Sequence, residues 1–348
     1  MALREVEGPA GAPWERALGG ALDALVVESE LLAGNALGDP ARRPLYVYRP
    51  PGSGHAQLPS IYVIQGYTGQ ADMWLGRTAF EPTSIERVDA LFADGGFPPA
   101  IVVFVDAWTS LGGSQFLNST STGRYMDYLC DEIVPFVDSR YPTAASREHR
   151  GIAGKSSGGY GAMVVPMLRP DVFGAFASHS GDALFEVTYL PEFRQVARML
   201  RDRFEGSYDV LLERFAASDH LEWGLYGVSL EMYGYACAYT PDPQRPGHPL
   251  LPFEIATGRL VEEVWAKWLE LDPVRMVPRH GEELASMRRI HLEAGRSDEA
   301  YLDLGAQAVS DELTKLGIEH TFELFDGRHG GLAYRYPAAI RELVMALD

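Results

Sequence analysis

A glycine-rich segment at residues 149–165 constrains the possible fold of this chain most strongly. It reads His-Arg-Gly-Ile-Ala-Gly-Lys-Ser-Ser-Gly-Gly-Tyr-Gly-Ala-Met-Val-Val and contains one G-x-S-x-G pattern, at Gly154–Gly158. The apolar residues before the pattern are typical of the end of a buried strand, and those after it of a helix. A strand, a tight turn and a helix are the setting of a nucleophile elbow, which exposes one serine hydroxyl, here that of Ser156. The alternative is an ordinary glycine-rich turn, and the presence of a base and an acid elsewhere in the chain must distinguish the two.

Predicted strands and helices alternate along most of the remaining chain. Apolar runs predict strands at residues 60–65, 100–105, 151–153, 173–179, 289–294 and 319–325, and helical periodicity predicts helices at 84–93, 123–139, 301–316 and 336–347. An antiparallel edge pair is expected at 25–32 and 44–48. This alternation predicts an α/β fold with a mostly parallel sheet and helices on both faces. Ligands of such sheets bind at the carboxyl ends of the strands.

The pattern divides the chain into three parts. We expect an N-terminal arm at 1–24, an α/β core at 25–182 and 286–348, and a helical cap insertion at 183–285. The insertion is dense in aromatic residues: Trp223, Tyr226, Tyr233, Tyr235, Tyr239, Trp265 and Trp268. These rings can line a pocket over the site or form the insertion's own small core, and the sequence leaves both alternatives open.

A serine nucleophile needs a base and an acid that orients the base. His329 lies in a glycine-containing loop directly after the last predicted strand, and we assign it as the base. His291 falls inside a predicted strand, where a core histidine is expected. Asp298 follows another strand end and is our candidate for the acid, with Asp182 as the alternative. Each candidate follows a strand, which favours a single site.

The remaining site assignments are positional. The oxyanion of the reaction needs two backbone donors, for which we expect the N–H groups of Tyr67 and Ser157. Candidate substrate contacts lie at or after strand ends, in the elbow helix or in the insertion: Gly66, Trp108, Tyr160, His179 and Tyr233. Lys155 and Arg328 flank the site, and solvated surface charge is the simpler interpretation of both.

These motifs resemble the putative-esterase family of α/β-hydrolases, which includes enterochelin-type esterases, S-formylglutathione hydrolases, feruloyl esterases and mycolyltransferases. The resemblance rests on Asn35–Pro40 with Tyr46–Pro51, on Gly154–Ala162, on Gly295–Glu299 and on Asp326–His329. It implies an α/β-hydrolase fold and a triad of Ser156, Asp298 and His329, the same three residues that the strand-end argument selects.

Three features depart from the family pattern. Gln65-Gly66 stands where relatives often carry His-Gly, which preserves a backbone donor but not a side-chain contact. Pro166 is expected to kink or shorten the helix after the elbow. Ser157 replaces the Met common in formylglutathione hydrolases, which weakens the interpretation as a thioesterase.

Composition limits the partners. The net charge of −18 disfavours nucleic acid and anionic membranes. Cys130 and Cys237 are the only cysteines, so neither a disulfide framework nor a zinc site is expected. No signal peptide is evident at the N-terminus, and we expect a cytoplasmic protein. We expect neither a metal nor a cofactor, and a homodimer is compatible with the sequence.

The sequence therefore predicts a serine hydrolase that cleaves small-molecule carboxylic esters through an acyl-enzyme. Acyl transfer or thioester hydrolysis with the same triad is the first alternative. A non-catalytic binding protein on a hydrolase scaffold is the second.

Overall fold

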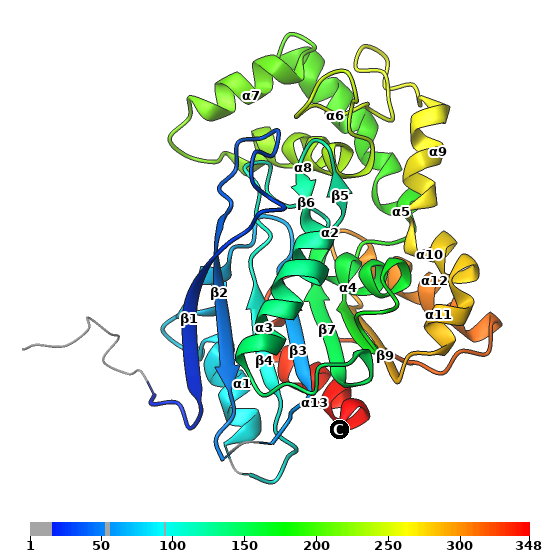
Figure 1. Ribbon diagram of the computed structural model, residues 1–348. Helices are drawn as coiled ribbons and strands as arrows, with labels where there is room; N and C mark the ends of the chain where they lie inside the picture. The colour runs from blue at the N-terminus through cyan, green and yellow to red at the C-terminus, as the bar shows by residue number, and fades with distance from the viewer. Residues whose placement is uncertain (1–15, 53–55, 94) are drawn as a thin grey trace, which may run out of the picture.

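The computed structural model describes residues 16–52, 56–93 and 95–348 and is built around an eight-stranded sheet (Figure 1). The strand order is β1–β2–β4–β3–β7–β8–β9–β10. The strands are β1 (Ala21–Glu28), β2 (Arg42–Arg49), β3 (Ser60–Ile64), β4 (Ile101–Val105), β7 (Arg150–Lys155), β8 (Ala175–His179), β9 (Arg289–Gly295) and β10 (Thr321–Phe325). The β1–β2 and β2–β4 pairs are antiparallel, and every other pair of the sheet is parallel. The predicted mostly parallel sheet with an antiparallel edge pair is confirmed.

Helices cover both faces of this sheet because its central strands are apolar on both sides. In β3, Ile61 and Val63 belong to one buried cluster, and Tyr62 and Ile64 belong to the other. The first cluster includes residues of α1 (Ser84–Phe92) and α13 (Tyr336–Leu347). The second includes residues of the helical stretch at 125–140, of α4 (Ser157–Leu168) and of α12 (Leu302–Lys315). This two-sided burial explains the unbroken apolar runs in the sequence.

The segment 183–285 forms a group of helices that join the second cluster. They are α5 (Phe185–Thr188), α6 (Leu190–Arg203), α7 (Tyr208–Ala216), α8 (Trp223–Tyr239), α9 (Glu262–Glu270), α10 (Pro273–Met276), η4 (Val277–Arg279) and α11 (Gly281–Ala285). Figure 1 shows α6 to α9 together at one end of the molecule. Trp268 of α9 and Ile152 of β7 lie in the same buried cluster. The aromatic residues of this segment therefore pack largely in a core that is shared with the sheet.

Several element boundaries differ from the sequence expectation. β1 begins at Ala21, inside the predicted arm. Just before it, the N–H groups of Gly19 and Gly20 donate to the Asp89 carboxylate. Residues 1–15 of the predicted arm lie outside the described residues. The predicted helix at 123–139 starts with a short strand, β6 (Gly123–Arg124), which pairs with β5 (Asn118–Ser119). It then continues as α2 (Tyr125–Asp127), a π-helical turn (Tyr128–Ile133) and α3 (Val134–Arg140).

Two local features shape the helices α1 and α4. Thr83 caps α1: its hydroxyl accepts from the Glu86 N–H at 3.1 Å, and the Glu86 carboxylate accepts from the Thr83 N–H at 2.7 Å. This reciprocal capping box satisfies two backbone donors at the helix start. Pro166 lies inside α4, which ends two residues later at Leu168, in keeping with a shortened helix.

Candidate active site

The turn between β7 and α4 places Ser156 in a strained conformation. Its φ of 59° and ψ of −127° are unusual for a residue with a side chain, and its N–H donates to the His179 carbonyl at 2.9 Å. The neighbouring glycines make the turn possible. A Cβ on Gly154 would lie 2.3 Å from the Gly158 carbonyl oxygen, and one on Gly158 would lie 2.6 Å from that of Gln65. The G-x-S-x-G segment thus has the geometry of a nucleophile elbow.

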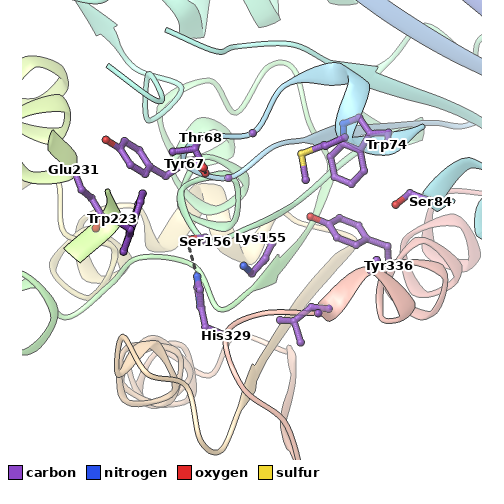
Figure 2. Close-up of a pocket in the computed structure, with 16 residues that line it drawn as sticks. Tyr67, Thr68, Trp74, Ser84, Lys155, Ser156, Trp223, Glu231, His329 and Tyr336 are labelled. Carbon is purple, nitrogen blue, oxygen red and sulfur yellow. Dashed lines mark hydrogen bonds between the residues drawn. The ribbon is translucent and has the colours of Figure 1, made fainter. Parts of the chain in front are cut away.

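A chain of hydrogen bonds joins Ser156, His329 and Asp298. The distance between His329 Nε2 and Ser156 Oγ is 3.1 Å, and that between His329 Nδ1 and Asp298 Oδ2 is 2.9 Å. Figure 2 shows His329 directed at Ser156. The three residues follow β7, β10 and β9, respectively, so the carboxyl ends of these strands bring them together. The His329 N–H also donates to Glu299 Oε2 at 2.9 Å, which fixes the histidine loop.

The two candidate acids occupy different positions. Burial disfavours ionisation of Asp298, but the hydrogen bond from His329 and its charge outweigh this effect and hold the pKa of that carboxyl below its ordinary value. Asp182 is 3% exposed, and its Oδ2 accepts from Gln115 Nε2 at 3.0 Å and from Ser157 Oγ at 3.4 Å. Burial raises the pKa of Asp182. Asp298 is therefore the carboxylate that contacts the imidazole.

The loop after β3 lies against the elbow. A Cβ on Gly66 would be 2.8 Å from the Lys155 carbonyl oxygen and 3.3 Å from Ser156 Cβ, so glycine permits this close approach. The loop is held by bonds from the Thr68 N–H to the Gly112 carbonyl and from the Gly69 N–H to the Gly66 carbonyl, at 2.8 and 3.0 Å. No described residue accepts from the N–H of Tyr67 or Ser157. Both groups remain available to an oxyanion.

Two cavities formed by described residues open on Ser156. One, of about 440 Å³, is lined by Gly66, Tyr67, Trp74, Lys155, Tyr336 and others (Figure 2). The other, of about 500 Å³, is lined by Asp182, Tyr189, Glu192, Tyr235, Glu299 and others. Ser156, His329, Trp223 and Glu231 border both. Residues from α6 and α8 thus form one wall of the site.

Four predicted substrate contacts do not border either cavity. Tyr160 is fully buried, and its hydroxyl donates to the Leu271 carbonyl at 3.1 Å. His179 is fully buried, with Nδ1 at 2.7 Å from Glu293 Oε1. Tyr233 bonds to His248 at 2.8 Å in a separate pocket, and Trp108 borders another pocket beside Arg43. Gly66 is the predicted substrate contact that borders the site.

Glu231 borders both cavities but is not among the site residues predicted from the sequence. It is the single charged residue of α8, whose sequence is otherwise apolar or uncharged, and this isolation was an available signal. Burial raises the pKa of Glu231 to about 7, although the Tyr235 hydroxyl donates to its Oε1 at 2.8 Å and opposes this shift. Trp223 and Tyr235, from the same helix, also border the cavities.

The two flanking cations differ from each other. Arg328 is exposed and pairs with Glu299, with Nε and Oε1 2.5 Å apart, which fits the expected surface charge. Lys155 borders the first cavity, where burial lowers its pKa although Asp298 and Asp182 oppose the shift. No carboxylate of the described residues lies within 4.0 Å of its ammonium group. Lys155 therefore contributes an unpaired positive charge next to Ser156.

The described residues contain neither a metal-binding cluster nor a membrane-spanning helix. No group of three or more His, Cys, Asp or Glu side chains in 16–52, 56–93 and 95–348 is arranged to hold a metal ion. Over the same residues, none of the helices has the length and hydropathy required to span a membrane.

Comparisons with known proteins agree with this fold. A ferulic acid esterase structure superposes with a TM-score of 0.57 at 17% identity, covering 95% of this chain and 100% of that one. An S-formylglutathione hydrolase from Agrobacterium tumefaciens gives 0.56 at 15% identity, covering 96% and 98%. At these identities the likeness concerns the fold alone, which is the α/β-hydrolase fold.

Sequence comparison is more specific about the family. An endo-1,4-beta-xylanase/feruloyl esterase from Xylanibacter ruminicola is 27% identical over 171 residues, which are 47% of this chain and 22% of that relative. The match thus spans about a fifth of the relative's length. A family model described as "Putative esterase" matches residues 36–335, most of the chain, and the protein therefore belongs to this esterase family.

Proposed function

We propose that this protein hydrolyses carboxylic esters of small molecules with Ser156 as the nucleophile, His329 as the general base and Asp298 as the residue that orients the imidazole. The observation that carries the proposal is the hydrogen-bonded chain of these three side chains at the carboxyl ends of parallel strands of one sheet. Family membership supports an ester as the substrate.

In this mechanism, Ser156 Oγ attacks the acyl carbon while His329 Nε2 takes the hydroxyl proton. Asp298 accepts from Nδ1 and stabilises the imidazolium that forms. The N–H groups of Tyr67 and Ser157 stabilise the oxyanion, each contributing about 2.7–4 kcal/mol by analogy with other oxyanion donors. His329 then gives its proton to the leaving alcohol. A water molecule, deprotonated by His329, attacks the acyl-enzyme and releases the acid.

We further propose that the segment 183–285 acts as a fixed cap over this site. Its contribution to the wall of the second cavity through Tyr189, Glu192 and Glu231 supports this role. In this proposal the cap selects the substrate, and the core residues perform the reaction.

The test is hydrolysis of p-nitrophenyl esters from acetyl to decanoyl, together with methyl ferulate because the curated relative is named a feruloyl esterase. Ester hydrolysis by the wild type and its loss in Ser156→Ala is the expected result. A fluorophosphonate probe should label the wild type and not Ser156→Ala. A folded wild type that neither turns over an ester nor reacts with the probe would refute the proposal. Product analysis with added alcohols distinguishes hydrolysis from acyl transfer.

A further inference from the structure

The two cavities beside Ser156 differ in charge. The first holds the Lys155 ammonium and shares Glu231 with the second. The second is bordered by four carboxylates, those of Asp182, Glu192, Glu231 and Glu299. The first cavity thus combines one cation with one carboxylate, whereas the residues that line the second include four carboxylates and no Lys or Arg.

Three of the four carboxylates in the second cavity have no cationic partner. Glu299 pairs with Arg328. By contrast, no Lys, Arg or His side chain in the described part of the chain lies within 4.0 Å of the carboxylates of Asp182, Glu192 or Glu231. Asp182 is 3% exposed, and Glu231 is half-buried. Uncompensated carboxylates in such positions carry a desolvation cost, and burial raises the pKa of all three.

Aromatic rings complete the wall of this cavity. Trp223, Tyr189 and Tyr235 border it together with the carboxylates. Tyr235 donates to Glu231 and packs against Tyr189, with ring centroids 5.1 Å apart, so the acid and the rings form one surface. Carboxylates next to aromatic faces are the features that bind an organic ammonium ion, through charge and through the ring quadrupole. The net charge of −18 also attracts cations toward the protein.

We infer that the second cavity binds a cationic group of the substrate, such as an alkylammonium, and that Glu231 is the residue that determines this specificity. The inference rests on the proposed esterase function and names the class of ester. Glu231 is the central element because it borders both cavities, next to Ser156 and His329. The substrates of this class share a cationic group close to the ester carbonyl, and this group lies on either the acyl or the alcohol side of the ester.

Two pairs of esters separate these sides. The first compares the 2-(trimethylammonio)ethyl ester of acetic acid with the 3,3-dimethylbutyl ester, which has the same shape and no charge. The second compares the methyl esters of 4-(trimethylammonio)butanoic and 5,5-dimethylhexanoic acids. We expect kcat/KM to favour the cationic member by about tenfold or more in at least one pair.

Glu231→Gln should reduce this preference several-fold, whereas Glu222→Gln should retain it, because Glu222 lies just before α8 and borders neither cavity. A wild-type ratio near one in both pairs would overturn the inference. An equal loss of kcat/KM on the cationic and the neutral ester of a pair in Glu231→Gln would also overturn it. Such a loss would mean that the carboxylate acts through His329 or through the stability of the fold.

Binding provides a readout that does not need turnover. Titration of the four esters into the Ser156→Ala protein should show the same preference of about tenfold for a cationic member. If the wild type hydrolyses no ester but this preference is present, the proposed function fails and the cation site stands. If neutral esters are hydrolysed and both members of each pair bind equally, the cation site fails alone.

Discussion

Replacement of Glu231 by Gln should stabilise the protein, and the gain should depend on pH. Burial raises the pKa of this carboxyl from an ordinary value of 4.5 to about 7 in the folded protein. Between these two values the folded state binds a proton that the unfolded state has lost. Each pH unit in this window therefore costs the wild type about 1.4 kcal/mol of unfolding free energy. Gln retains an oxygen that can accept from Tyr235 and carries no charge.

The expected gain is near zero at pH 4.5, rises with pH and levels off above about pH 7. Because the side chain is only half-buried, we expect about 1–3 kcal/mol at pH 8. Urea unfolding of the wild type and Glu231→Gln at pH 5, 6, 7 and 8 measures this difference, with the exposed Glu222→Gln as the control. A difference that is constant across this range, or a destabilised Gln variant at pH 8, would refute the reasoning.

Three other predictions concern separate features. Asp298→Asn should reduce kcat by about 10³–10⁴-fold because it removes the acceptor that selects the His329 tautomer, whereas Asp182→Asn should reduce kcat at most about tenfold. Steady-state ester kinetics measure both effects, and the reverse order would assign the orienting role to Asp182. Gly158→Ala should abolish most ester turnover, since its Cβ would lie 2.6 Å from the Gln65 carbonyl oxygen. Gly224→Ala should leave the near-UV circular dichroism and kcat close to wild type, because its Cβ would meet no atom within 4 Å apart from the adjacent residues and the backbone of its own helix. Thr83→Ala should lower the free energy of unfolding by about 1 kcal/mol through loss of the capping box, and no change in urea unfolding would contradict that role.

The catalytic candidates could be predicted from sequence because each follows a strand. Parallel strands bring their carboxyl ends to one edge, so Ser156, Asp298 and His329 needed no knowledge of side-chain packing. His179 also ends a strand but is a strand residue itself. Its side chain points to one face of the sheet, where the register pairs it with Glu293.

Sheet order, which the sequence does not contain, decided the position of Trp108. It follows β4, and β3 separates β4 from β7, so Trp108 is displaced sideways from Ser156 by two strand spacings, or ~10 Å.

Helix phase explains the outcome for the aromatic residues of α8. Glu231 and Tyr235 are four residues apart and share the face that borders the site, whereas Tyr233 lies roughly 200° around the helix from each and points to another pocket. Sequence periodicity cannot distinguish these faces, because α8 is apolar on nearly all sides. The position of the one acid on this helix would have identified the face toward the site.

The core shared by the sheet and the segment 183–285 limits how this protein can be engineered. Tyr160 of α4, four residues after Ser156, packs against Tyr239 of α8 at 5.7 Å between ring centroids and donates to the Leu271 carbonyl after α9. Exchange of this segment for that of a relative would remove the partners of a helix that supports the elbow. A folded chimera must therefore transfer α4 together with α5–α11, so the wall of the second cavity and the helix that follows Ser156 are inherited as one unit.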